Sequence, residues 1–211
     1  MTDLNDTNDF PARVFRRADE TADERFYDFP RFVTHIDDAA IDAVTELYRE
    51  FFPANGAILD LMSSYVSHLP TDVKYSRVAG LGMNRAELEG NPRLTEAVVQ
   101  NINVNQKLPF ETDEFDGAAI CVSVQYLINP IAVFRDIART LKTGAPLVIT
   151  FSNRCFPTKA VFAWSALDDD GHIELVGEYF ARSKSFSRVE IRKHQPRAGD
   201  PLFAVVGRVK K

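Results

Sequence analysis

Short apolar runs of strand length recur along the chain from residue 57 to residue 209. Several, such as Ala57-Ile58-Leu59-Asp60-Leu61-Met62, are almost continuously apolar, which is typical of strands buried on both faces of a parallel sheet. The last two runs alternate apolar and polar positions, as half-buried strands do. The pattern predicts seven strands, over residues 57–62, 75–81, 98–103, 116–123, 147–151, 186–192 and 202–209.

Apolar residues at helical spacing predict helices between these strands. The first helix starts at Asp37 or Asp38, either of which can cap it, and ends at Pro53. Asn129 is expected to cap a second helix, with Pro130 at the position where a missing N–H costs nothing. Shorter segments are expected over 63–69 (a helix or a turn), 84–90, 159–166 and 173–181, the last two separated by the acidic turn 168–171.

Strands that alternate with helices predict right-handed crossovers and a parallel sheet. The two final strands are joined by a turn of proline, glycine and aspartate, so we expect a hairpin whose last strand is antiparallel to its neighbours. The predicted fold over residues 37–211 is therefore α/β, with a doubly wound, seven-stranded and mostly parallel sheet. Residues 1–36 are polar, and the first 30 of them contain four phenylalanines, which indicates an N-terminal arm that is partly ordered.

Composition and charge narrow the classes of partner. The net charge is −5, and a nucleic-acid binder would need a concentrated basic face for the phosphates. No stretch approaches the roughly 20 apolar residues of a membrane span, and the N-terminus lacks the pattern of a secretory signal. Two cysteines and four histidines without ligand spacing predict neither a disulfide framework nor a metal site. We expect a cytoplasmic protein without nucleic-acid or membrane partners, and the oligomeric state stays open.

Several sequence segments resemble motifs of the class I S-adenosylmethionine-dependent methyltransferases, and they occur in the order and spacing of that family. The segment 108–116, Leu-Pro-Phe-Glu-Thr-Asp-Glu-Phe-Asp, is similar to the family's approach to its fourth strand. The segment 129–144 is similar to the helix and turn before the fifth strand, and residues 58–61 stand where the first motif begins. The resemblance covers about residues 40–211. It implies a Rossmann-like methyltransferase fold with S-adenosylmethionine as the cofactor.

The first cofactor motif departs from the family pattern. Asp60 keeps the acidic residue of the first strand, but Met62 and Ser63 stand in a turn that is rich in glycine in the family. Glycine lets the backbone approach the methionine part of the cofactor closely. The side chains of this turn must therefore point away from the cofactor or fill part of its site.

The next two motifs are altered as well. Gly82, followed by Met83, stands where the resemblance implies an acid for the ribose hydroxyls, and Glu87 could substitute for it. Asn101, followed by Ile102, stands where an aspartate faces the adenine, and an amide oxygen can still accept a hydrogen bond there. With Ser123 after the fourth strand, the expected cofactor-binding residues are Asp60, Met62, Ser63, Gly82, Met83, Asn101, Ile102 and Ser123.

Two further residues are the candidate catalytic groups. Methyl transfer needs a nucleophile held in line with the methyl group, and positioning residues therefore matter most. Tyr126 follows the fourth strand and could orient an acceptor or simply pack. Arg154 follows the fifth strand and could bind a carboxylate or phosphate of the acceptor, or pair with a surface acid.

Two functions follow from these residues. Asp60 and Asn101 favour an S-adenosylmethionine-dependent methyltransferase that acts on a small-molecule acceptor. The altered turn at Met62 and the missing acid at Gly82 favour a catalytically inactive methyltransferase-fold protein that binds or regulates. A dinucleotide enzyme is disfavoured because no G-x-G-x-x-G follows the first strand. We predict the enzyme and keep the inactive protein as the alternative.

Overall fold

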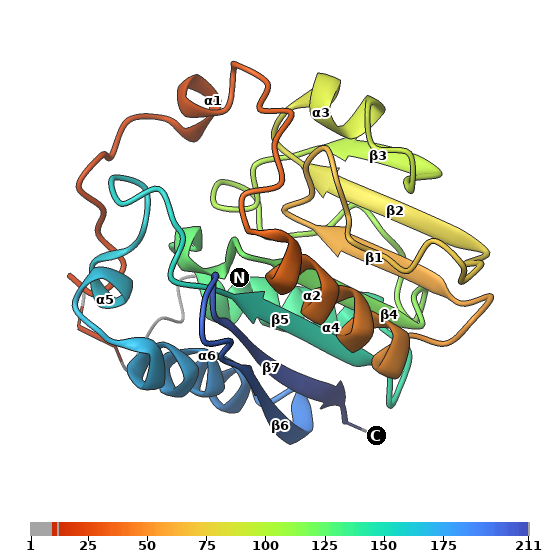
Figure 1. Ribbon diagram of the computed structural model, residues 1–211. Coiled ribbons are helices and arrows are strands. Elements are labelled where there is room, and N and C mark those ends of the chain that lie inside the picture. The colour runs from red at the N-terminus through yellow and green to blue at the C-terminus, as the bar shows by residue number, and fades with distance from the viewer. Residues whose placement is uncertain (1–9, 12, 211) are drawn as a thin grey trace.

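A computed structural model describes residues 10, 11 and 13–210. Its centre is a seven-stranded sheet with the order β3-β2-β1-β4-β5-β7-β6 (Figure 1). The strands are β1 Ala57–Leu61, β2 Arg77–Gly82, β3 Glu96–Val99, β4 Gly117–Cys121, β5 Pro146–Phe151, β6 Phe186–His194 and β7 Leu202–Val209. The helices are α1 Asp23–Phe26, α2 Asp38–Phe51, α3 Arg85–Glu89, α4 Pro130–Thr140, α5 Phe162–Ser165 and α6 Asp169–Ser183, with a 3-10 turn η1 over Val124–Tyr126.

The strand pairing confirms the predicted fold class. β1 pairs in parallel with β2 and β4, β2 with β3, and β4 with β5. β7 lies between β5 and β6 and is antiparallel to both. The sheet is therefore mostly parallel and closes with the antiparallel hairpin that the final two apolar runs predicted.

Two hydrophobic cores cover the two faces of the sheet. Leu59 and Leu61 belong to the core that contains the buried residues of α4 and α6, whereas Ile58 belongs to the core beneath α2. Neighbouring residues of a strand point to opposite faces, so this division places α4 and α6 on one face and α2 on the other. The near-continuous apolar character of β1 reflects this burial on both faces.

Some boundaries differ from those expected. Residues 63–69 form a loop without a helix, and β3 ends at Val99, which leaves Asn101 on the turn that follows the strand. The acidic turn at 168–171 is the start of α6, because the Asp168 carboxylate accepts a hydrogen bond from the Gly171 N–H at 2.9 Å and caps the helix. The helix expected over 159–166 is reduced to the four residues of α5.

Residues 13–36, called the strap below, cross the carboxyl ends of the strands before α2 (Figure 1). The strap pairs with the chain after β5, since the Asp19 N–H donates to the Thr158 carbonyl and the Phe162 N–H donates to the Arg16 carbonyl. Further along, the Asn84 side-chain amide donates to the carbonyls of Tyr27 and Asp28 at 2.9 and 3.1 Å. The strap is therefore fixed at both ends of its path.

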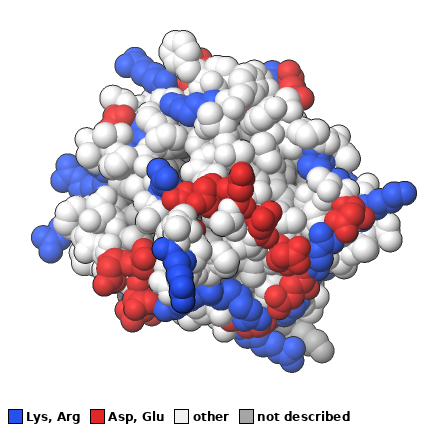
Figure 2. Space-filling model, in the orientation of Figure 1, with Lys and Arg blue, Asp and Glu red and all other residues white. Residues whose placement is uncertain are grey.

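An acidic band follows α2 on one face of the molecule (Figure 2). Figure 2 shows a band of acidic side chains along this helix, which contributes the exposed residues Asp38, Asp42, Glu46 and Glu50. Within residues 10, 11 and 13–210, no helix combines the length and the apolar character needed to cross a membrane.

Candidate functional site

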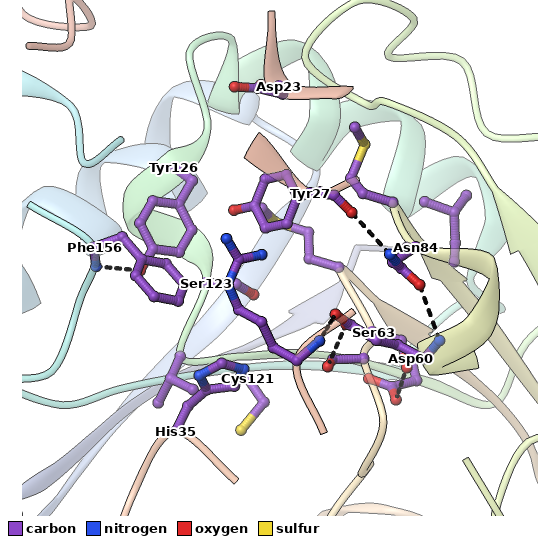
Figure 3. Close-up of a pocket in the computed structure, with 18 of the residues that line it drawn as sticks. Asp23, Tyr27, His35, Asp60, Ser63, Asn84, Cys121, Ser123, Tyr126 and Phe156 are labelled. Atoms are coloured by element: carbon purple, nitrogen blue, oxygen red, sulfur yellow. Dashed lines mark hydrogen bonds between the residues drawn. The ribbon is translucent and has the colours of Figure 1, made fainter. Parts of the chain in front are cut away.

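A cavity of about 260 Å³ lies between the carboxyl ends of the parallel strands and the strap. All ten residues singled out from the sequence line it: Asp60, Met62, Ser63, Gly82, Met83, Asn101, Ile102, Ser123, Tyr126 and Arg154. Figure 3 shows Tyr126 and Phe156 on one side of the cavity and Asp60, Ser63 and Asn84 on the other. The structure thus brings the candidates together, and the role of each stays a prediction.

Serine hydroxyls organise the turn after β1. The buried Asp60 carboxylate accepts hydrogen bonds from the hydroxyls of Ser63 and Ser67 at 2.7 and 2.6 Å. Met62 has a φ of 54°, a left-handed conformation that glycine adopts more easily. The turn therefore has a left-handed residue where glycine is favoured, and Ser63 and Ser67 point back to Asp60.

Burial raises the pKa of Asp60 to about 6, although the two serine hydrogen bonds lower it. The folded chain then holds a proton that the unfolded chain has already released, so this group destabilises the fold as the pH rises from about 4 to above 6. The difference of about 2 pKa units corresponds to about 3 kcal/mol. Asp60→Asn should lack this part of the pH dependence. Urea unfolding of the parent protein and Asp60→Asn between pH 4 and 8 measures this pH dependence. If the free energy of unfolding changed with pH in the same way in both proteins, the prediction would be wrong.

The end of β2 is occupied by backbone instead of an acid. The Ser63 N–H donates to the Leu81 carbonyl at 2.9 Å, and a Cβ on Gly82 would lie 2.2 Å from the Ser63 carbonyl oxygen. The turn after β1 thus packs directly on the end of β2. Gly82 is glycine because of this close approach, so an acid at this position is excluded by the path of the turn.

Glu87 and Asn84 lie beside this position on the cavity wall. The Asn84 Oδ1 accepts the Glu87 N–H at 3.1 Å and caps α3. The buried Glu87 carboxylate accepts from the Ser64 hydroxyl at 2.7 Å and from the Arg31 N–H at 2.6 Å. Each carboxylate oxygen of Glu87 accepts one of these hydrogen bonds and can accept another. Glu87 was expected from the sequence as a substitute for the acid, whereas Asn84 was not, and its position before a predicted helix was the available signal.

Asn101 faces the strap from the turn after β3. Its amide nitrogen donates to the Glu24 carboxylate at 2.8 Å, and its Oδ1 accepts the Asn103 N–H at 3.0 Å. The hydrogen bond from Asn101 lowers the pKa of Glu24. Asn103, which the sequence interpretation passed over, donates to Asp23 at 3.0 Å and to the Tyr126 carbonyl at the same distance.

The chain after β4 supplies a free hydroxyl. Val122 has a φ of 41°, a strained conformation for a β-branched residue of the kind that clusters at functional sites. The next residue, Ser123, is buried, and its hydroxyl has no hydrogen-bond partner in the described part of the chain. This oxygen lines the cavity and can bind a ligand without breaking an existing bond.

Tyr126 and Arg154 differ in how they are engaged. Burial raises the pKa of Tyr126 to about 12, so its hydroxyl is neutral, and its oxygen accepts the Phe156 N–H at 2.8 Å. Arg154 lies at the rim with 65% of its side chain exposed and pairs with Asp200 at 2.8 Å. Of the two interpretations of Arg154, the contacts show pairing with an acid.

Buried charges hold the strap over the cavity, and none of them stood out in the sequence. Lys159 is fully buried, and its ammonium group lies 3.1 Å from the Asp19 carboxylate and 3.4 Å from the Asp23 carboxylate. Asp23 also pairs with Arg17 at 2.7 Å. Over residues 10, 11 and 13–210, no group of three or more His, Cys, Asp or Glu side chains is arranged to hold a metal ion.

Comparison with known proteins supports the fold. No family model and no curated protein matches the sequence. Among solved structures, a protein from Pyrococcus horikoshii OT3 is similar with a TM-score of 0.61 at 16% identity, over 88% of this chain and 99% of that one. An S-adenosylmethionine-dependent methyltransferase from Mesorhizobium loti is similar with a TM-score of 0.55 at 16% identity, over 80% of this chain and 99% of that one. The cyclase SpnF is similar with a TM-score of 0.58 at 14% identity, over 80% of this chain and 81% of that one.

These likenesses agree with the strand order and with the position of the cavity. The similar structures include several S-adenosylmethionine-dependent methyltransferases, and at this level of identity they establish the fold alone. The chain therefore has the class I methyltransferase-like fold.

Proposed function

We propose that this chain binds S-adenosylmethionine in the cavity and transfers its methyl group to a small-molecule acceptor. The observation that carries the proposal is the position of the cavity. The sheet runs outward from β1 through β2 to β3 and then crosses to β4 on the other side of β1. Ligands of open α/β sheets bind at the carboxyl ends of the strands at such a switch point, and the ten candidate residues line the cavity there.

The residues present fit the cofactor, with one substitution. Asn101 and the buried Ile102 would hold the adenine, and the turn at Ser63 with the free hydroxyl of Ser123 would hold the methionine part. Glu87 would accept the ribose hydroxyls in place of an acid at Gly82. When bound, S-adenosylmethionine supplies a methyl group activated by its sulfonium.

The chain's own contribution to the reaction would be positioning. The Tyr126 oxygen already accepts the Phe156 N–H, so its O–H proton can be donated to an acceptor in the cavity. The strap covers the carboxyl ends of the strands and would keep water from the reacting groups. An acceptor held in line with the methyl group reacts faster because the entropy of orientation has already been lost on binding.

Calorimetric titration with S-adenosylmethionine and S-adenosylhomocysteine tests the proposal. We expect saturable binding of both ligands, followed by transfer of a labelled methyl group to a small molecule. Absence of binding by a folded chain would contradict the proposal. The cytoplasmic location and the lack of nucleic-acid and membrane partners remain predictions from the sequence.

One observation favours a catalytically inactive binding protein instead. The Met62-Ser63 turn and Gly82 depart from the pattern of the family. Binding of both ligands without methyl transfer to any of a broad panel of acceptors would support this alternative.

Glu87→Gln tests the assignment of the ribose. Charge-assisted hydrogen bonds contribute about 1.5–3 kcal/mol each, so loss of the charge should weaken S-adenosylhomocysteine binding by about tenfold or more. Glu89→Gln is the matched control, because Glu89 lies on the same helix with 62% of its side chain exposed. Equal affinity of the Glu87→Gln and parent proteins would show that another group holds the ribose.

A further inference from the structure

The Arg31 side chain extends from the strap between aromatic rings. Its backbone N–H is fixed on Glu87, and its guanidinium donates to the Phe26 carbonyl at 2.8 Å. The guanidinium carbon lies 4.5 Å from the centre of the Phe26 ring and 5.3 Å from that of Phe156. Arg31 lines the cavity and is half-buried, so its charge faces an enclosed space.

Among the described residues, Arg31 has no acidic ion-pair partner, in contrast to the other arginines of the cavity. Arg17 pairs with Asp23 at 2.7 Å, and Arg154 pairs with Asp200 at 2.8 Å. In the described ranges 10, 11 and 13–210, no carboxylate lies within ion-pair distance of the Arg31 guanidinium. Two of its five N–H groups reach carbonyl oxygens, and the others are available to a ligand.

The neighbouring acids are engaged elsewhere. The Glu87 carboxylate binds the Ser64 hydroxyl and the Arg31 backbone, and Asp60 binds two serine hydroxyls. Burial lowers the pKa of His35, so the imidazole beside Phe156 is neutral at pH 7. A partly desolvated cation without an anion is unfavourable, and a carboxylate that binds the guanidinium through two hydrogen bonds would relieve this cost.

The walls beside the guanidinium are flat and apolar. The Phe26 and Phe156 rings meet edge to face at 5.2 Å, and Tyr126 stacks on Phe156 at 6.0 Å. Aromatic rings next to a cation fit a planar ligand that carries a negative charge at one edge. Tyr126 and Phe156 lie on one side of the cavity, across from Asp60 and Asn84 (Figure 3).

We propose that Arg31, Phe156 and Tyr126 form the acceptor subsite, with Phe26 packed against Arg31 and Phe156, and that the acceptor is a planar aromatic carboxylate. The inference rests on the proposed function, since an acceptor is meaningful only if a methyl group is transferred. S-adenosylmethionine also ends in a carboxylate, and the experiment separates these two sources of the same chemistry.

The probes are benzoate and its neutral isostere benzamide, titrated by ligand-observed NMR into protein saturated with S-adenosylhomocysteine. We expect benzoate to bind about tenfold tighter than benzamide, and Arg31→Gln to abolish this preference. Arg31→Lys keeps the positive charge and should retain part of the preference for benzoate. Arg25→Gln, an exposed position on the same strap, is the matched control and should leave the preference unchanged. Unchanged circular dichroism and unfolding midpoints establish that each variant is folded.

Two results would overturn the inference. Equal binding of benzoate and benzamide by the parent protein would exclude a carboxylate subsite. Weaker S-adenosylhomocysteine binding by Arg31→Gln, with unchanged binding of 5′-methylthioadenosine, would assign Arg31 to the cofactor's carboxylate. If the parent protein binds benzoate through Arg31 but does not bind S-adenosylhomocysteine, the proposed function fails and the carboxylate subsite stands.

Discussion

Replacing Lys159 by methionine should release the strap from the cavity while the sheet stays folded. The Lys159 ammonium donates to the Thr21 carbonyl at 2.7 Å and lies between the carboxylates of Asp19 and Asp23, with 1% of its side chain exposed. Removal of one partner from a buried ion pair leaves the other charges uncompensated and costs about 3–5 kcal/mol. Asp23 keeps Arg17 as a partner, so we expect the lower end of this range.

Hydrogen exchange measures the release. The Asp19 N–H, bonded to the Thr158 carbonyl, and the Arg31 N–H, bonded to Glu87, report on the two parts of the strap. A loss of about 3 kcal/mol should make their exchange more than about a hundredfold faster, with no change in the central strands. Lys107→Met, at an exposed lysine, is the control. Unchanged protection at Asp19 in Lys159→Met would show that the buried charges do not hold the strap.

The sheet could be predicted because its signals are local. The runs at 57–62, 116–123 and 147–151 consist mostly of consecutive apolar residues, and proline, glycine and aspartate mark the turn of the final hairpin. The expectation that the last strand is half-buried is wrong, because β7 lies between β5 and β6 and its first six residues are all buried. The right-handed crossover rule limits the possible topologies of these strands, whereas their order is known only from the structure. β3 covers residues 96–99, whereas the pattern predicts a strand over 98–103. Only Ala97 to Val99 are apolar within β3, and a strand this short at the edge of the sheet has a weak pattern.

The strap could not be predicted in the same way. Its contacts join residues far apart in the chain, such as Lys159 with Thr21, Asn103 with Asp23, and Arg31 with Glu87. Nothing local marks a lysine that will be fully buried, because its burial depends on acids from another segment. The four phenylalanines within residues 1–30 were the available signal, and Phe26 packs against Phe156.

The location of the candidate site could be predicted from the sequence better than the role of each residue in it. Parallel strands end at the same edge of a sheet, so residues that follow each strand necessarily meet at the cavity. The reason for each residue type depends on three-dimensional neighbours. Gly82 stood out only as a missing acid, whereas the structure shows the Ser63 carbonyl oxygen where its side chain would be.

Gly82→Asp should therefore destabilise the protein strongly and should not restore a ribose acid. A Cβ at this position would lie 2.2 Å from the Ser63 carbonyl oxygen, so the turn after β1 must move to accept any side chain. Overpacking costs about 1–3 kcal/mol, and a buried carboxylate without donors adds to this, so we expect a loss of about 3 kcal/mol or more in urea unfolding. Gly82→Ala should lose somewhat less of its free energy of unfolding, because alanine adds no buried charge.

Gly177→Ala is the matched control for this substitution. Gly177 lies inside α6, where an added Cβ would meet no atom within 4 Å, so alanine should stabilise the helix by about 0.5–1 kcal/mol. S-adenosylhomocysteine titration of the Gly82 variants then distinguishes two explanations of the glycine. If the turn must pack closely on β2, both variants lose affinity, since Met62 and Ser63 are displaced. If the site merely lacks an acid, Gly82→Asp binds more tightly than the parent protein while Gly82→Ala does not, and that result would contradict the steric account.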